Sequence, residues 1–409
     1  MISKRAAALI AIVVALFTAF FSIVICVTVV EYRSISNGNI AGEQFGELKD
    51  FYRKFNGVKD IIEKSYLEEP NSEDLLDGAL KGLVEGLEDP YSYYMTAEEY
   101  KEMLIDIEGS YAGVGLSVTV NTDDNQITVM NVFKGSPAES VGMMAGDKII
   151  GIGDESVDGA MLDEAVSKMR GEPDTDVSVT VNRDGDIVKF DLTRAIVEYP
   201  DMEYRMINDR VGYIWLYRFD QNSAGNMKSA IAELQGLGME GLVLDLRSNP
   251  GGLLTACLEI ADIFLPKGLI MYSEDRYGAR EEHSSTSDQV DIPLAVLING
   301  FSASASEVFA GAIQDHEVGV VIGKTTFGKG LVQSLMPFTE GDVLRLTTSE
   351  YFTPNGRKIN GIGVIPNIEV DDLEEAYEFT RDNPGEQLPV ELDAALTRGI
   401  EELTGLIGE

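Results

Sequence analysis

The stretch that decides the fold is residues 293–333, PLAVLINGFSASASEVFAGAIQDHEVGVVIGKTTFGKGLVQ. Apolar residues 294–298 predict a strand, and the Asn-Gly pair after them predicts a tight turn. Small and apolar residues 303–313 predict a helix, and residues 318–322 predict a second strand that leads to the glycine-flanked Lys329. Strand, turn, helix and strand in this order indicate an α/β core.

The serine-rich turn between the first strand and the helix suits a nucleophile. Backbone N–H groups are unpaired at the start of a helix, and the helix dipole is positive there. An oxyanion formed at this turn would therefore be stabilised.

A nucleophilic serine needs an adjacent base. The chain has two histidines, His283 in a polar segment expected to be a loop, and His316 in a turn expected to be solvated at the end of the helix. Neither setting is typical of a catalytic histidine. A buried, neutral lysine is the alternative base. Lys329 fits because two glycines let the backbone approach closely and apolar neighbours can desolvate the amine, which Gln333, four residues on, could orient.

Both motifs also have plain structural readings. Residues 304–307, Ser-Ala-Ser-Glu, match a helix capping box. The Gly-Lys-Gly tripeptide matches an ordinary turn with an exposed lysine. Spacing alone leaves these alternatives open.

SASASE followed by TFGKGLVQ resembles the signature of the C-terminal processing peptidases, or tail-specific proteases. These are serine proteases with a Ser-Lys dyad, a ClpP/crotonase-like α/β core and an inserted PDZ domain. The resemblance implies that Ser304 is the nucleophile, Lys329 the general base and Gln333 the residue that orients the lysine. Two separated motifs agree in order and spacing, and further similar segments cover most of the chain.

Residues 245–252, DLRSNPGG, resemble the motif whose glycine backbone supplies part of the oxyanion hole in this family. Proline has no N–H, so the donor is expected to be Gly251 or Gly252, together with the N–H of Ala305 after the nucleophile. Asp245 and Arg247 are expected to brace the turn.

Residues 108–195 change to short alternating strands with glycine turns and resemble the family's PDZ domain, most clearly in GSPAE and GMMAGDKIIGI. The loop before the first long strand would present backbone N–H groups to a peptide's terminal carboxylate, and the peptide would add as a strand along the following edge. Without this context, the glycines would indicate only a turn. The expected peptide-binding residues are Gly113, Val114, Gly115, Leu116 and Val118.

Arg170, in KMRGEPDT, matches an arginine that can couple peptide occupancy to the protease domain in the family. Asp174-Thr175 stands where the family often has Gly-Thr. A solvated arginine is the alternative.

Ala6–Val30 is an almost unbroken apolar run after Lys4 and Arg5, long enough to span a bilayer. The two basic residues favour a cytoplasmic N-terminus, so we expect a signal anchor with the catalytic part outside the cytoplasm of a bacterial cell. A cleaved signal peptide is the alternative. A disulfide between Cys26 and Cys257 is not expected.

The length and net charge of the chain limit the number of domains and the class of partner. The 409 residues suggest two or three domains, and a net charge of -37 argues against nucleic acid as a partner. The sequence predicts five segments: the cytoplasmic tip and transmembrane anchor (1–35), a linker and helical segment (36–107), the PDZ domain (108–195), the serine protease core (196–375) and a C-terminal helical segment (376–409). The resemblance also implies dimerisation through the terminal helical segments.

The predicted function is a membrane-anchored, extracytoplasmic serine endopeptidase that captures exposed apolar C-termini of proteins or peptides. No metal or organic cofactor is expected, because no cluster of His, Cys and carboxylates has ligand spacing. The alternatives are a catalytically silent PDZ scaffold and a crotonase-type acyl-CoA enzyme, the latter disfavoured by the anchor and the PDZ domain.

Overall fold

The structure is a computed structural model that describes residues 40–121, 124–286, 289–382 and 388–408. The chain divides between Leu83 and Val84 into two compact units. The expected transmembrane helix at Ala6–Val30 lies outside the described residues, as does Cys26. Among the described ranges, no helix has the length and apolar character needed to cross a membrane.

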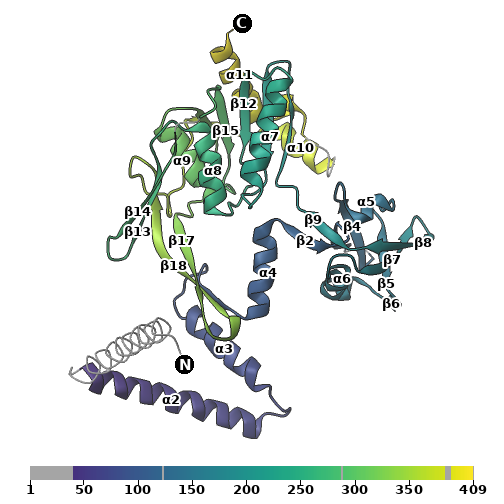
Figure 1. Ribbon diagram of the computed structural model, residues 1–409, viewed down its shortest axis with the longest axis vertical. Helices are drawn as coiled ribbons and strands as arrows, with labels where there is room; N and C mark the ends of the chain where they lie inside the picture. The colour runs from purple at the N-terminus through teal and green to yellow at the C-terminus, as the bar shows by residue number, and fades with distance from the viewer. Residues whose placement is uncertain (1–39, 122–123, 287–288, 383–387, 409) are drawn as a thin grey trace, which may run out of the picture. The chain divides into compact units, whose positions relative to one another are not determined.

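Two helices make up the described part of the first unit. Helix α2 spans Ile40–Ser65, and α3 spans Ser72–Glu85 and so runs just past the unit boundary (Figure 1). The Asn71 side chain accepts the N–H of Glu73 at 2.9 Å and caps the start of α3. Apolar side chains of both helices face a shared groove of about 510 Å³, among them Phe51, Phe55, Val58, Ile62, Leu75 and Leu76.

The second unit is built around a six-stranded sheet with the order β10-β11-β12-β15-β16-β19. Strand β10 is antiparallel to β11, and every other pair is parallel. The strands are β10 Met202–Met206, β11 Val211–Leu216, β12 Gly241–Asp245, β15 Leu294–Ile298, β16 Val320–Gly323 and β19 Ile368–Glu369. The strand predicted at residues 294–298 is confirmed as β15.

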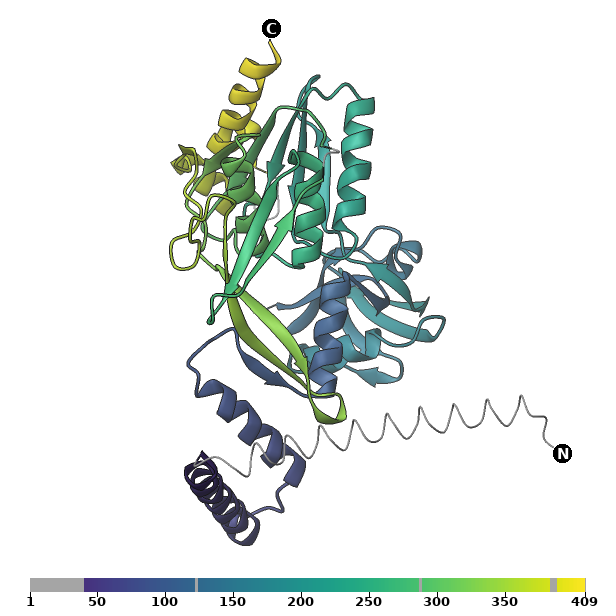
Figure 2. The same ribbon diagram turned by 60° about the vertical axis from the view of Figure 1, so that its left-hand side comes forward.

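Helices cover both faces of this sheet, which is why β12 and β15 read as continuous apolar runs. Leu242 and Leu244 point to one face, and Val243 between them points to the other. Figures 1 and 2 show helices on both faces of the sheet. They are α7 Ser223–Gly236, α8 Leu254–Phe264 and α9 Ala305–Asp315, opposite α11 Ala394–Ile407.

The C-terminal helix α11 is thus part of the core, because it buries Leu396 and Leu403 against the sheet. The predicted helical segment at residues 376–409 did not anticipate this packing. The connections include α10 Glu374–Asp382 and the short helices η2 Thr339–Gly341 and η3 Val390–Leu392.

A second sheet has the order β1-β18-β13-β14, with β17 paired to β18. Its strands are β1 Tyr93–Met95, β13 Leu269–Asp275, β14 Arg280–Ser284, β17 Leu331–Pro337 and β18 Val343–Phe352. The sequence predicted a linker and helical segment at residues 36–107, and it missed β1 within that range because three residues are too few to show a period of two. Helix α4, Ala97–Glu108, follows with a capping box between Thr96 and Glu99.

The region predicted as a PDZ domain contains a separate sheet with the order β3-β4-β5-β7-β8 and β6 paired to β5. It has its own apolar core. The β2 and β9 strands form a two-stranded ribbon at its two ends in the sequence. The elements are β2 Ser110–Gly113, β3 Leu116–Asn121, β4 Gln126–Val132, α5 Pro137–Ser140, β5 Lys148–Ile152, β6 Glu155–Ser156, η1 Gly159–Met161, α6 Leu162–Met169, β7 Asp176–Arg183, β8 Asp186–Thr193 and β9 Ala195–Glu198.

Candidate active site

Two turns meet at the carboxyl ends of the parallel strands β12 and β15. Adjacent parallel strands end at the same edge of a sheet, so the turns that follow them are neighbours. The N–H of Ser248 donates to Asn299 Oδ1 at 2.9 Å, and the N–H of Ala303 donates to the carbonyl of Asn249 at 3.0 Å. These bonds tie the DLRSNPGG turn to the serine-rich turn.

A cavity of about 600 Å³ opens beside these turns. Its wall includes every residue predicted to be catalytic or to form the oxyanion hole: Gly251, Gly252, Ser304, Ala305, Lys329 and Gln333. The structure therefore brings together residues that lie up to 82 positions apart in the chain.

Ser304 occupies the residue before helix α9 in a backbone conformation that is rare outside glycine, with φ 56° and ψ -114°. Such conformations persist only where the surroundings enforce them, and they are frequent at active sites. Here the Ser304 N–H donates to Glu307 Oε2 at 2.8 Å. The buried thiol of Cys257 also donates to the Ala305 carbonyl at 3.1 Å.

The Lys329 side chain is half-buried in the loop between β16 and β17. Burial is the main cause that lowers the pKa of Lys329, and the positive charge of Arg345 lowers it further, whereas Asp89 and Glu307 act in the opposite direction. The Lys329 Nζ lies 4.5 Å from the ring centroid of Tyr91. The pKa of the amine is thus lower than that of a free lysine, whereas the contact with the Tyr91 ring favours the charged form.

Gln333 lies on β17 with its amide turned toward β18. Its Oε1 accepts Arg345 Nη2 at 3.2 Å, and its Nε2 donates to Thr347 Oγ1 at 3.4 Å. These contacts leave Gln333 in the same cavity as Lys329 but with its amide engaged by β18.

Tyr351, on β18, is a site residue that the sequence reasoning did not identify. Its side chain is buried, and its hydroxyl donates to the carbonyl of Lys329. Burial raises the pKa of Tyr351 well above the usual range of a phenol, although the nearby Ser304 hydroxyl acts in the opposite direction. This strand was not predicted from the sequence, and its register against the Lys329 loop depends on long-range pairing.

The two glycines considered for the oxyanion hole differ in their environment. The Gly251 N–H is buried and donates to Asn249 Oδ1 at 2.8 Å. Gly252 is exposed, with φ 143°, and an added Cβ would lie 2.0 Å from the carbonyl oxygen of Phe219. Among the hydrogen bonds of the described residues, none uses the N–H of Gly252 or of Ala305.

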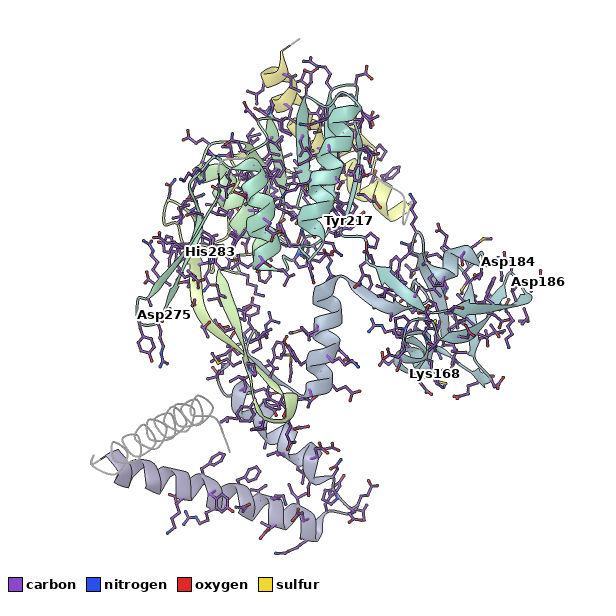
Figure 3. The ribbon with its side chains drawn as sticks, in the orientation of Figure 1. Lys168, Asp184, Asp186, Tyr217, Asp275 and His283 are labelled. Atoms are coloured by element: carbon purple, nitrogen blue, oxygen red, sulfur yellow. The ribbon has the colours of Figure 1, made fainter. Side chains whose placement is uncertain are left out.

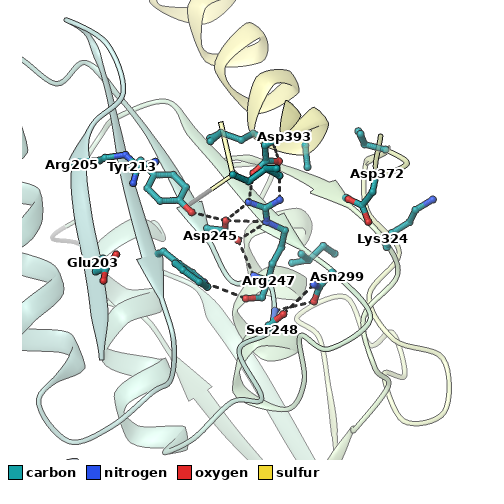
Figure 4. Close-up of a pocket in the computed structure, with 17 residues that line it drawn as sticks. Glu203, Arg205, Tyr213, Asp245, Arg247, Ser248, Asn299, Lys324, Asp372 and Asp393 are labelled. Atoms are coloured by element: carbon teal, nitrogen blue, oxygen red, sulfur yellow. Dashed lines mark hydrogen bonds and ion pairs between the residues drawn. The ribbon is translucent and has the colours of Figure 1, made fainter. Parts of the chain in front are cut away.

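The rear of the DLRSNPGG turn is held by ion pairs. Figure 4 shows Arg247 between Asp245 and Asp393 of the C-terminal segment. Its Nε lies 2.9 Å from Asp245 Oδ1, and its Nη1 lies 2.8 Å from Asp393 Oδ1. Tyr213 adds a hydrogen bond to Asp245 at 2.8 Å. The predicted bracing role of Asp245 and Arg247 agrees with these contacts.

The two histidines are not among the residues that line the cavity of Ser304. His316 follows α9, and its Nε2 lies 2.7 Å from the Leu269 carbonyl, so it is half-buried rather than solvated. His283 lies on β14 (Figure 3), so the predicted loop there is wrong. The strand was missed because its residues are polar and β14 is an edge strand with little burial. Within the described ranges, no group of three or more His, Cys, Asp or Glu residues is placed to hold a metal.

The expected peptide-binding loop precedes β3, which is an edge strand of its sheet, as strand addition requires. Gly115 has φ 86°, and an added Cβ would collide with Ser136 at 2.1 Å. Val114 is buried, whereas Leu116 and Val118 are half-buried against the core beneath. Gly113 ends β2, directly before this loop.

The chain's own Tyr111 occupies this loop. Burial raises the pKa of Tyr111 to about 12, although the backbone N–H groups of Leu116 and Gly115, which lie beside its hydroxyl, act in the opposite direction. Its ring packs on Tyr199, with the centroids 5.0 Å apart. The Tyr111 hydroxyl therefore lies where it can compete for two of the predicted carboxylate donors.

Arg170 is the C-cap residue of α6 and is not a solvated side chain. Its guanidinium lies 5.3 Å from the ring centroid of Tyr111, and its Nη2 donates to the Tyr199 hydroxyl at 3.3 Å. Asp174, in the following loop, has φ 62°. Arg170 thus contacts the residue that fills the carboxylate loop.

Comparisons with known proteins agree with this architecture. Three family models match: peptidase family S41 at residues 210–370, the PDZ domain at residues 104–182 and the activating protease CtpB N-terminal domain at residues 26–99. The carboxy-terminal-processing protease of Bartonella bacilliformis is 38% identical over 334 residues, which are 79% of this chain and 76% of that protein. A Staphylococcus aureus protein named "Probable CtpA-like serine protease" is 34% identical over 84% of this chain and 69% of its own length. A solved structure of a photosystem II D1 C-terminal processing protease is 30% identical, with a TM-score of 0.48, over 82% of this chain and 93% of that one.

Proposed function

Because the chain belongs to peptidase family S41 and is a serine-type peptidase with a PDZ domain, we propose that it captures exposed apolar C-termini and cleaves the captured protein with a Ser-Lys dyad. The main support for the dyad is that both residues line one cavity. In this cavity, Ser304 lies at a strained turn and Lys329 has a lowered pKa. The name of the Bartonella bacilliformis relative supports processing at a carboxy terminus, and the name of the Staphylococcus aureus relative supports a serine protease.

In the proposed first step, neutral Lys329 removes the proton of Ser304, and the alkoxide oxygen attacks the peptide carbonyl carbon. For this transfer the amine leaves the Tyr91 ring and approaches the Ser304 oxygen. The Gln333 amide orients the amine after exchanging its bonds to Arg345 and Thr347. Burial favours the reaction, since a desolvated amine is neutral over more of the pH range.

The oxyanion of the tetrahedral intermediate is stabilised by two backbone N–H groups. We assign these to Gly252 and Ala305, because Gly251 already donates to Asn249. The N–H of Ala305 opens helix α9, where the helix dipole adds to the stabilisation. Collapse of the intermediate breaks the peptide C–N bond, and the leaving amine takes the proton from Lys329. Water, deprotonated by the same lysine, then hydrolyses the acyl-enzyme.

Substrate capture is assigned to the PDZ domain. The peptide adds to the open edge of β3, and its terminal carboxylate accepts the N–H groups of Val114, Gly115 and Leu116. The carboxylate must displace the Tyr111 hydroxyl, which lies beside two of these donors. Arg170 contacts Tyr111, so it is placed to respond to that displacement.

We also propose that the apolar run at Ala6–Val30 anchors the protein in the bacterial cell membrane, with the catalytic part on the extracytoplasmic side. Homodimerisation through the terminal helical segments is part of the same proposal. The exposed apolar residues Phe51, Val58 and Leu76 of the first unit support a partner there.

The direct test incubates the full-length protein, in detergent, with a carboxymethylated unfolded protein that ends in apolar residues. The same protein ending in two aspartates is the matched control. Cleavage of the apolar-tailed form, lost in Ser304→Ala and in Lys329→Ala, supports the proposal. Binding of the tail without cleavage by wild type would instead support a PDZ scaffold.

A further inference from the structure

A buried carboxylate connects the turn of Ser304 to the loop of Lys329. Glu307, in the first turn of α9, has an exposed fraction of 0%. Its Oε2 accepts the N–H of Ser304 and the N–H of Lys329, each at 2.8 Å. Its Oε1 accepts the N–H of Gly328 at 2.7 Å and the hydroxyl of Thr326 at 2.6 Å.

All four partners of Glu307 are donors. Three are backbone N–H groups, which can only donate. The fourth is the Thr326 hydroxyl, which already accepts the N–H of Val364 at 2.6 Å, so its own proton points to Glu307. A carboxylate is acceptor-only and satisfies all four donors, which an amide of the same shape cannot do.

One oxygen atom is therefore shared by the backbones of the two residues assigned to the dyad. Because Oε2 lies 2.8 Å from each nitrogen, the two nitrogens can be no farther apart than those two bonds laid end to end. The bond from the Ser304 N–H to Glu307 Oε2 holds Ser304 in its strained conformation, with φ 56°. A helix cap needs only the bond to the Ser304 N–H, so the three donors from residues 326–329 have no role in capping.

We propose that Glu307 is the positioning residue of the catalytic pair, a single buried carboxylate that fixes the nucleophile turn against the lysine loop. The proposal rests on the proposed Ser-Lys function. Glu307 acts through Ser304 and Lys329, and substrate does not touch it. Glu307 affects the pair in two ways, because it fixes their geometry and places a negative charge near the amine.

The charge gives a readout that a purely structural role would not move. Lys329 faces the positive charge of Arg345, the negative charges of Asp89 and Glu307, and the aromatic ring of Tyr91; Tyr351 contacts its backbone carbonyl. Since Glu307 is one of the charges that raise the pKa of Lys329, its removal must lower that pKa. The rise of activity with pH then moves to lower pH.

The test measures how fast a fluorophosphonate probe labels the nucleophilic serine of the full-length protein from pH 6 to 10. The variant is Glu307→Gln, and the matched control is Glu99→Gln, which alters the equivalent capping-box glutamate of α4. We expect Glu307→Gln to label on the order of 100-fold more slowly at the plateau, as expected for a misplaced reacting group, and its pH midpoint to fall. Cleavage should show the loss in kcat with KM unchanged, and Glu99→Gln should match wild type.

A plateau rate and pH midpoint equal to wild type in Glu307→Gln would overturn the proposal. If circular dichroism shows that Glu307→Gln does not fold, the proposal is tested instead with Thr326→Val and Thr326→Ser. Valine removes the hydroxyl that donates to Glu307, whereas serine keeps it. Labelling several-fold slower in Thr326→Val than in Thr326→Ser supports the proposal, and equal rates refute it. Failure of the underlying function has a different signature: wild type does not label, or Ser304→Ala labels equally well.

Discussion

The cleft of the protease core and the carboxylate loop of the PDZ domain both offer backbone N–H groups to an incoming oxygen. They differ in whether another group of the chain already lies against those N–H groups. In the cleft, the N–H groups of Gly252 and Ala305 have no partner among the described residues. In the PDZ loop, the Tyr111 hydroxyl lies beside the backbone N–H groups of Gly115 and Leu116. The reacting site is thus open, whereas the recognition site is occupied by the chain itself.

This difference separates the two energetic tasks of the molecule. Preorganised donors stabilise a transition state best because they need no rearrangement during the reaction. Donors that must first exchange a partner weaken binding, because the ligand gains only the difference between two hydrogen bonds. We therefore expect substitutions in the cleft to change rates strongly and substitutions in the PDZ loop to change affinity modestly.

The largest effect is expected for Ser304→Ala. Loss of the nucleophile should lower kcat on the order of 10⁴-fold or more. Binding of a C-terminal peptide to the PDZ loop should stay at the wild-type level, which fluorescence anisotropy with a labelled apolar-tailed peptide can measure. If Ser304→Ala kept a tenth of the wild-type cleavage rate, Ser304 would not be the nucleophile.

Gly252→Ala should have the next largest effect. The added Cβ would lie 2.0 Å from the Phe219 carbonyl oxygen and force the turn to move, so one oxyanion donor is displaced. Loss of one such donor typically costs 10²–10³ in kcat, so cleavage should fall about 100-fold or more with peptide affinity unchanged. Gly225→Ala is the control, because its Cβ would meet nothing within 4 Å. Equal losses in both variants would indicate a general effect on folding.

Tyr111→Phe should have a smaller effect of the opposite sign. It removes the hydroxyl that competes for the Gly115 and Leu116 N–H groups and keeps the ring that packs on Tyr199. A net hydrogen bond is worth about 0.5–1.5 kcal/mol, so peptide affinity should rise about 2- to 10-fold. Tyr204→Phe, whose hydroxyl instead binds Glu233, is the control for calorimetry. Weaker peptide binding by Tyr111→Phe would show that the hydroxyl assists the ligand.

Arg345→Gln should have the smallest effect, a shift of the pH profile. A nearby positive charge disfavours a protonated amine, and Arg345 lowers the pKa of Lys329. Its removal raises that pKa, so the increase of kcat with pH should begin at higher pH. Arg280→Gln, at a strand of the β13–β14 hairpin, serves as the control for the loss of one charge. A shift to lower pH would contradict the assignment of Lys329 as the base.

Local patterns predicted the strands and turns that carry the site. Residues 294–298 read as a buried strand because helices cover both sheet faces, and the serine turn follows directly. Features set by long-range pairing could not be read from the sequence. Tyr351 reaches Ser304 and Lys329 only through the register of β18, and β1 exists because it pairs with β18. The contacts of Gln333 with Arg345 and Thr347 are likewise cross-strand and have no local signal.

The central claim is tested most directly by trapping the covalent intermediate. Full-length protein is mixed with an apolar-tailed peptide, quenched in acid within milliseconds to seconds, digested and analysed by mass spectrometry. The account predicts an acyl group on the peptide that contains Ser304 in wild type, and its absence in Lys329→Ala. A peptide product that accumulates with no adduct on Ser304 at any time, or an adduct on another residue, would contradict it.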